Sequence, residues 1–195
     1  MSALSGETHV AVIGAGAMGA GIAQVAAQAG HTVMLYDTRP GAAAEGLAGI
    51  DRQLSRLVEK GRLQAAERAA ICNRLRPVDS LEALADAGLV IEAIVEDLQV
   101  KQALFQQLES ECRSDCILAS NTSSLSITRL ASGLQRPERV VGMHFFNPAP
   151  LMALVEVVSG LATAPDVAAV VHATAQAWGK RPVYARSTPG FIVNR

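Results

Sequence analysis

The stretch His9-Val10-Ala11-Val12-Ile13-Gly14-Ala15-Gly16-Ala17-Met18-Gly19 decides the fold of this 195-residue chain. Its apolar first half is typical of a buried strand, and it runs directly into a GxGxxG pattern that opens an Ala-rich helical stretch. The first glycine permits a tight turn, the second lets the backbone approach a pyrophosphate, and the third lets helix and strand pack closely. The strand–turn–helix context therefore predicts a dinucleotide site at the N-terminus of this helix.

Asp37 follows the next predicted strand and adds an acidic partner to the glycines. A carboxylate there accepts hydrogen bonds from a ribose 2′-hydroxyl and repels a 2′-phosphate, which favours NAD over NADP. Arg39 argues the other way, because an arginine can accommodate the extra phosphate. The plainer alternative is that the glycines only make a turn and Asp37 only caps a local segment.

Short β-branched runs alternate with longer helical stretches, which is typical of an α/β fold with a doubly wound, mainly parallel sheet of the Rossmann type. The predicted strands are His9–Ile13, Thr32–Tyr36, Gly88–Glu92, Cys116–Ala119, Arg139–Met143, Leu154–Val158 and Pro182–Tyr184. The predicted helices are Gly19–Ala29, Val100–Cys112, Ile127–Ala131 and Val167–Trp178, with a helical region from Gly41 to Leu75 that breaks near Gly61.

Composition argues against several classes of protein. With 17 Lys and Arg against 18 Asp and Glu, the formal net charge is -1. The chain therefore lacks the excess of basic residues that is typical of proteins that bind nucleic acid or an anionic membrane. No apolar run reaches the roughly 18 residues that span a bilayer, and the N-terminus does not resemble a secretory signal. Cys72, Cys112 and Cys116 form no CxxC and lack metal-type partners, so we expect reduced thiols, no metal and a cytoplasmic location.

Polar side chains follow three of the predicted strands. They are Glu96 and Lys101 after the third strand, Ser120-Asn121-Thr122-Ser123-Ser124 after the fourth, and His144 and Asn147 after the fifth. Because ligands of open α/β sheets bind beyond the carboxyl ends of the strands, we expect these groups to converge on the face of the glycines. The alternatives are local: Glu96 and Lys101 as helix-terminus charges, and Ser124 or Ser126 as the N-cap of the next helix.

His144 suits a proton acceptor in carbinol–carbonyl chemistry, because imidazole titrates near neutral pH. Glu156 interrupts the apolar run Leu154–Val158. It either faces inward, where a buried carboxylate needs a partner such as His144, or alternates outward to solvent, and the pattern leaves both open. Ser123 lacks a GxSxG context, which favours a hydroxyl donor to a substrate oxygen over a nucleophile.

Five segments carry a family resemblance. They are Val12–Ala23, Val90–Asp97, Ser120–Leu125, His144–Pro148 and Pro189–Arg195. Together they resemble the L-3-hydroxyacyl-CoA dehydrogenases over essentially the whole chain. Leu154–Ala164 and Trp178-Gly179-Lys180 look most like the bacterial phenylacetate-pathway branch, whose substrate is a dicarboxylic hydroxyacyl-CoA.

The resemblance implies NAD-dependent oxidation of a (3S)-3-hydroxyacyl-CoA to the 3-oxoacyl-CoA. It implies that His144 takes the hydroxyl proton, that Glu156 orients and supports it, and that Ser123 hydrogen-bonds the substrate oxygen. Asn194 would help to position the reacting group. Further positions match residues that line the cofactor or substrate, namely Glu96, Lys101, Asn121, Ser123 and Asn147.

The helical segment after Asp37 matches a CoA-contacting helical arm, on which Lys60 is expected to meet a CoA phosphate. Gln53 stands where relatives have a serine contact, and Ala153 where many have a lysine, so the acyl-chain environment stays open.

Pro189–Arg195 predicts the first turn of a helix, after which the sequence stops. By resemblance, residues 1–188 form the NAD-binding domain, and 189–195 begin a helical domain that supplies a homodimer interface and closes over the acyl-CoA. We therefore expect the present chain to bind NAD and to turn over poorly.

Two rival interpretations remain. A dehydrogenase of the 3-hydroxy acid or 6-phosphogluconate type would use a catalytic lysine in place of His144 and Glu156. A non-catalytic nucleotide-binding module would need no base–carboxylate pair.

Overall fold

An eight-stranded sheet in the order β3-β2-β1-β4-β5-β6-β7-β8 forms the centre of the computed structural model, which describes residues 2–188 and 190–193. The strands are β1 Val10–Ile13, β2 Val33–Tyr36, β3 Leu75–Val78, β4 Leu89–Glu92, β5 Ile117–Ser120, β6 Val140–Phe145, β7 Leu154–Ser159 and β8 Arg181–Arg186. All neighbouring strands run parallel except β6 and β7, which are antiparallel. The predicted Rossmann-like α/β class is confirmed.

Helices cover both faces of the sheet. They are α1 Ala17–Gln28, α2 Ala42–Glu59, α3 Ala65–Cys72, α4 Leu98–Glu111, α5 Ile127–Ala131 and α6 Pro165–Ala177. Because successive strand residues point to opposite faces, β1 sends Val10 and Val12 into a core shared with α1 and α6, and Ala11 and Ile13 into one shared with α4 and α5. No helix of the described residues is long and apolar enough to cross a membrane.

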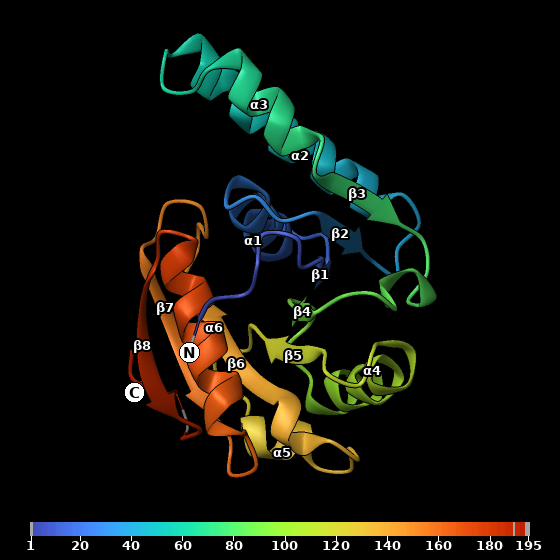
Figure 1. Cartoon of the computed structure of the whole chain (residues 1–195). Helices are drawn as coiled ribbons and strands as arrows, with labels where there is room; N and C mark the ends of the chain where they lie inside the picture. The colour runs from blue at the N-terminus through green and yellow to red at the C-terminus, as the bar shows by residue number, and fades with distance from the viewer. Residues whose placement is uncertain (1, 189, 194–195) are drawn as a thin grey trace.

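Helices α2 and α3 project from the sheet as a helical arm (Figure 1), which we define as residues 42–72. Leu54 of α2 is fully buried in the core and anchors the arm. Asp51 accepts two hydrogen bonds from the Arg68 guanidinium, at 2.9 and 2.8 Å, and one from the Cys72 thiol at 3.2 Å. These contacts clamp α3 against α2, so the arm is a pair of packed helices and not one long helix.

Two predicted boundaries were wrong, one of a helical region and one of a strand. The helical region was expected to reach Leu75, but α3 ends at Cys72 and Leu75–Val78 pairs with β2 as an edge strand. Pro77 fits there because an edge strand tolerates a missing N–H. The strand expected to stop at Met143 continues to Phe145, so His144 lies within β6 rather than after it.

Candidate active site

The carboxyl ends of the parallel strands β2, β1, β4 and β5 meet at one edge of the sheet, where the register aligns Tyr36, Ile13, Glu92 and Ser120. A cavity of about 380 Å³, here called the strand-end cavity, opens at this edge. Its lining includes Met18, Glu96, Lys101, Asn121, Ser123, His144 and Asn147. The structure thus brings together seven of the residues expected to form the site.

His144 and Glu156 form a buried pair at the base of this cavity. The antiparallel register places them directly opposite each other on β6 and β7, and His144 Nδ1 lies 2.7 Å from Glu156 Oε2. Their exposed fractions are 5% and 0%. Of the two orientations that the sequence left open for Glu156, the inward one is therefore correct.

Both oxygens of Glu156 are engaged, which fixes the roles of the imidazole nitrogens. Oε1 accepts from the backbone N–H groups of Ile192 and Val193 at 2.9 and 3.1 Å, so Oε2 is the atom that receives His144 Nδ1–H. A carboxylate partner at Nδ1 keeps the proton on that nitrogen and leaves the lone pair of Nε2 for the cavity. Phe146 packs against the imidazole, with ring centroids 4.5 Å apart. The geometry is that of an oriented general base.

A second buried charge cluster lies under the other side of the cavity. Lys101 is 1% exposed, and its Nζ lies 2.5 Å from Glu92 Oε1 and 3.3 Å from Glu96 Oε2. Glu92 is fully buried and also accepts from the Ser120 hydroxyl at 2.7 Å. Sequence reasoning placed Glu92 only as the last residue of a strand. The signal that could have found it is a charge that closes an otherwise apolar buried strand.

The loop after β5 wraps around Glu96. The hydroxyl of Thr122 and the backbone N–H of Ser123 donate to Glu96 Oε1 at 2.5 and 3.0 Å. Burial raises the pKa of Glu96, but these hydrogen bonds and the charge of Lys101 together hold that pKa below its usual value. Asn121 Oδ1 accepts from Phe145 N–H at 2.8 Å and joins this loop to β6. The loop is therefore rigidly attached to the strand that carries His144.

The glycine motif has the shape of a phosphate cradle. A Cβ on Gly14, whose φ is 99°, would lie 2.5 Å from the carbonyl oxygen of Ala93, and one on Gly19 would lie 1.7 Å from that of Gly14. Gly16 has no atom within 4 Å of the space that its Cβ would take, and it caps α1 without a side-chain hydrogen bond. Gly14 and Gly19 thus permit close packing. Gly16 leaves open space in front of the free N–H groups at the start of the helix, and this space fits a pyrophosphate.

Asp37 stands at the end of β2, beside the cradle. Its Oδ2 accepts from Ala15 N–H at 2.7 Å and its Oδ1 from Arg39 N–H at 2.9 Å. The Arg39 guanidinium pairs with Glu45 of α2 at 2.7 Å. Since Glu45 holds Arg39, the carboxylate of Asp37 is the group that a ribose at this point would meet. The residues present fit a dinucleotide without a 2′-phosphate.

A larger cavity of about 570 Å³, here called the arm cavity, lies between α1, α2 and the loop after β6. Asn147 lines both cavities, so they meet at that residue. Gln53 and Leu57 of the arm line it, whereas Lys60 lies exposed at the end of α2 and is not among the lining residues. Gln24, which sequence reasoning missed, also lines it: the side chain is 4% exposed, and its Oε1 has no hydrogen-bond partner among the described residues.

Three other predictions have separate outcomes. Ser126, not Ser124, caps α5, since its hydroxyl accepts from Arg129 N–H at 3.3 Å. Ala153 is exposed beside the arm cavity's loop. Residues 190–193 form a turn in which Gly190 and Phe191 have φ values of 72° and 50°, so the helical turn expected after Pro189 is not formed there, because a right-handed helix needs negative φ. Pro189 and Asn194 lie outside the described residues, so the expected role of Asn194 stays a prediction.

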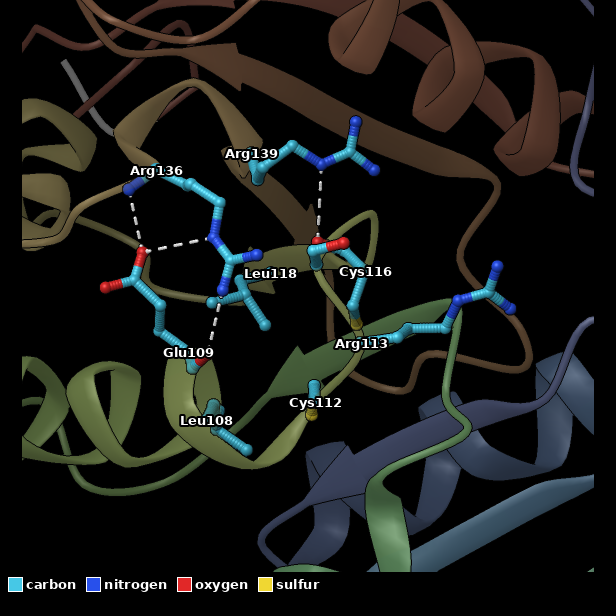
Figure 2. A pocket seen from close by; sticks show the side chains of 9 residues that line it. Leu108, Glu109, Cys112, Arg113, Cys116, Leu118, Arg136 and Arg139 are labelled. Carbon is cyan, nitrogen blue, oxygen red and sulfur yellow. Dashed lines mark hydrogen bonds and ion pairs between the residues drawn. The ribbon is translucent and has the colours of Figure 1, made fainter.

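The thiols Cys112 and Cys116 lie near the start of β5, at the opposite end of that strand from the site. Figure 2 shows them with Arg136, which pairs with Glu109, and Arg139, which donates to the Cys116 carbonyl oxygen. The cavity there measures about 10 Å³, the space of about one water. It is too small for a metabolite. No group of three or more His, Cys, Asp or Glu in the described part of the chain could hold a metal ion.

Comparisons with known proteins show which family the chain resembles. Residues 9–188 match the family described as "3-hydroxyacyl-CoA dehydrogenase, NAD binding domain". A "3-hydroxyadipyl-CoA dehydrogenase" of Escherichia coli K12 is 54% identical over 95% of this chain and 39% of its own length. A "Probable 3-hydroxybutyryl-CoA dehydrogenase" of Bacillus subtilis is 47% identical over 96% of this chain and 65% of its own length.

A solved structure is also similar. The crystal structure of (S)-3-hydroxybutyryl-CoA dehydrogenase from Ralstonia eutropha superposes with a TM-score of 0.94 at 40% identity, over 97% of this chain and 67% of that one. The present chain thus spans between 39% and 67% of the length of these three relatives. Its cofactor is NAD, and the chain belongs to the 3-hydroxyacyl-CoA dehydrogenase family as an NAD-binding domain.

Proposed function

We propose that this chain is the NAD-binding part of an enzyme that oxidises a (3S)-3-hydroxyacyl-CoA to the 3-oxoacyl-CoA. The observation that carries the proposal is the buried His144–Glu156 pair, which opens on the same cavity as Met18 of the glycine motif. A binding module has no need of a base held by a buried acid. The non-catalytic alternative therefore leaves this pair unexplained.

The proposed proton path follows from the hydrogen bonds of His144. Nε2 takes the proton of the substrate 3-hydroxyl, because Glu156 holds the other proton on Nδ1. The negative charge of Glu156 then stabilises the imidazolium that forms. Ser123 also lines the cavity, and in this proposal its hydroxyl exchanges a long 3.4 Å hydrogen bond to Glu96 for one to the substrate oxygen. Bound NAD supplies the acceptor for the hydride that leaves C3.

We further propose that the arm cavity takes the pantetheine portion of the acyl-CoA. It joins the strand-end cavity at Asn147, so a thioester could pass from one into the other. The lining of this cavity is mostly apolar or small, from Ala20 and Gly21 of α1 to Leu57 of α2, which suits the slender pantetheine chain. Lys60, at the outer end of the arm, would then meet a CoA phosphate, and Gln53 would replace the serine contact.

The loop between these cavities is held in place by Lys180. Its ammonium donates to the carbonyl oxygens of Ala149 and Met152, at 2.5 and 2.9 Å. Desolvation by burial lowers the pKa of Lys180. This anchor holds the segment that follows Asn147, a residue that we propose contacts both cofactor and substrate.

The 54% identity to a 3-hydroxyadipyl-CoA dehydrogenase supports a dicarboxylic acyl chain as the finer assignment. The proposed place in phenylacetate catabolism rests on the sequence resemblance alone. The positioning role of Asn194, the homodimer and the cytoplasmic location remain part of this proposal.

The test is NADH formation from 3-hydroxyadipyl-CoA and 3-hydroxybutyryl-CoA, measured with this chain and with a form extended to the length of its relatives. We expect His144→Gln to abolish NADH formation by the extended form while NAD affinity stays nearly unchanged. His9→Gln, which changes an exposed histidine, is the matched control and should retain the rate. Undiminished activity in His144→Gln would remove the base, and tight NAD binding without turnover of either thioester would support the binding module.

A further inference from the structure

Glu92 has no part in the mechanism above, yet it is among the most buried charged groups in the described structure. Its side chain is 0% exposed at the carboxyl end of β4. Three donors reach it: the Lys101 ammonium at 2.5 Å, the backbone N–H of Ile94 at 2.7 Å and the Ser120 hydroxyl at 2.7 Å. An ionised carboxylate only accepts hydrogen bonds, and this arrangement supplies only donors.

The charges around Glu92 do not cancel. The cluster has one cation, Lys101, which pairs with the two carboxylates of Glu92 and Glu96. Glu96 is held ionised by the loop after β5, since its pKa lies below its usual value. One positive and two negative charges leave this cluster with a net charge of -1. Two of the three side chains, Glu96 and Lys101, line the strand-end cavity, and Glu92 lies beneath them.

We propose that Glu92 sets this excess negative charge and thereby shifts the relative affinity of the site toward NAD⁺ and away from NADH. The inference rests on the proposed function: a hydride acceptor for a substrate held by His144 and Ser123 has to lie in the cavity that both residues line, so the nicotinamide end of the cofactor belongs in the strand-end cavity. The oxidised nicotinamide ring carries a positive charge and the reduced ring is neutral, while the phosphates and the adenosine are the same in both. A fixed negative charge under the ring therefore stabilises one redox form and leaves the other nearly unaffected.

The size of the effect follows from Coulomb's law. For a ring about 10 Å from the cluster and an effective dielectric constant of about 20 to 40, one unit charge changes the affinity ratio about fourfold to fifteenfold. Salt screens buried charges weakly, so the preference should persist at physiological ionic strength. Glu92 also positions Lys101, whose own charge acts on the oxidised ring, so the test needs a variant that removes the charge of Glu92 and keeps an acceptor for Lys101.

The experiment is a titration of this chain with NAD⁺ and with NADH, by calorimetry and by NADH fluorescence. Glu92→Gln removes the charge while an amide oxygen can still accept from Lys101 and Ile94. We expect the ratio of the Kd for NAD⁺ to the Kd for NADH to rise about fourfold to fifteenfold. Ser120→Ala is the matched control, because it removes one hydrogen bond to Glu92 and no charge. Its two Kd values should change by the same factor.

If Glu92→Gln fails to fold, Glu96→Gln provides the second test, since it removes one negative charge from the same cluster and should move the ratio in the same direction. The inference is overturned if the ratio of the Kd for NAD⁺ to the Kd for NADH stays unchanged in a folded variant that lacks the charge. It is also overturned if Ser120→Ala raises that ratio as much as Glu92→Gln does. That outcome differs from a failure of the proposed function, in which the unaltered chain binds neither nucleotide or His144→Gln retains activity.

Discussion

Replacing Glu156 by Gln should invert the protonation of the catalytic imidazole. Glu156 Oε1 accepts from Ile192 and Val193 N–H, and Oε2 accepts from His144 Nδ1–H. A glutamine has one oxygen and one NH₂ group for these three donors. If the NH₂ group faces the two backbone N–H groups, two donors lose their acceptor at about 1–3 kcal/mol each. If it faces His144 instead, Nδ1 must become an acceptor and Nε2 must carry the proton.

The second arrangement satisfies every group, so it should dominate. The penalty avoided is about 2–6 kcal/mol, and a central value near 4 kcal/mol leaves about one molecule in 10³ with an unprotonated Nε2. The rate of proton abstraction, and with it NADH formation by the extended form, should fall by about 10³. NAD affinity should remain the same, because Glu156 is buried beneath His144 and does not line the strand-end cavity.

The assay is ¹⁵N NMR of the labelled chain at mildly alkaline pH, which distinguishes the two neutral imidazole tautomers. The unaltered chain should show His144 with its proton on Nδ1, and Glu156→Gln should show it on Nε2. Glu138→Gln makes the same chemical change at an exposed carboxylate and should leave both tautomer and rate unaltered. An Nδ1–H tautomer in Glu156→Gln, or a rate within tenfold of the original, would refute the reasoning.

Three further predictions concern the cofactor site and stability. Gly16→Ala should fold normally but lose NAD affinity in calorimetry, because the new Cβ meets no protein atom and fills the phosphate cradle. Gly19→Ala should instead unfold at a lower urea concentration, because its Cβ would overlap the Gly14 carbonyl. Asp37→Ala should weaken NAD far more than NADP in parallel titrations; equal losses would contradict the ribose contact. The stabilisation from ionised Glu96, whose pKa is lowered, should be present above about pH 4.5 and be lost as the pH falls through the lowered value. The difference in urea stability between the chain and Thr122→Val should therefore narrow in acid to the part that comes from the Leu125 N–H bond to Thr122 Oγ1.

The centre of the sheet could be predicted because buried parallel strands are continuous apolar runs, as in Leu89–Ile91 and Ile117–Ala119. The edge strand β3 could not, since Arg76 and Pro77 interrupt its pattern. The convergence of Glu96, Ser123 and His144 followed from the rule that ligands bind beyond the carboxyl ends of parallel strands.

What remained undecided depended on contacts between distant segments. Alternation along β7 allows Glu156 to face either way, and only the antiparallel register with β6 places it opposite His144. The buried role of Glu92 depends on Lys101, one element later in the chain. The arm cavity arises from the packing of α1 against α2, which no local pattern encodes.

The central claim is that the nicotinamide end of NAD lies in the strand-end cavity beside the His144–Glu156 pair, and a crystal structure of this chain with NAD bound tests it most directly. We expect the pyrophosphate over Gly16 at the start of α1, and C4 of the nicotinamide in the cavity that His144 Nε2 faces. A ring outside that cavity, or a His144 side chain turned away from Glu156 in the bound state, would contradict the claim.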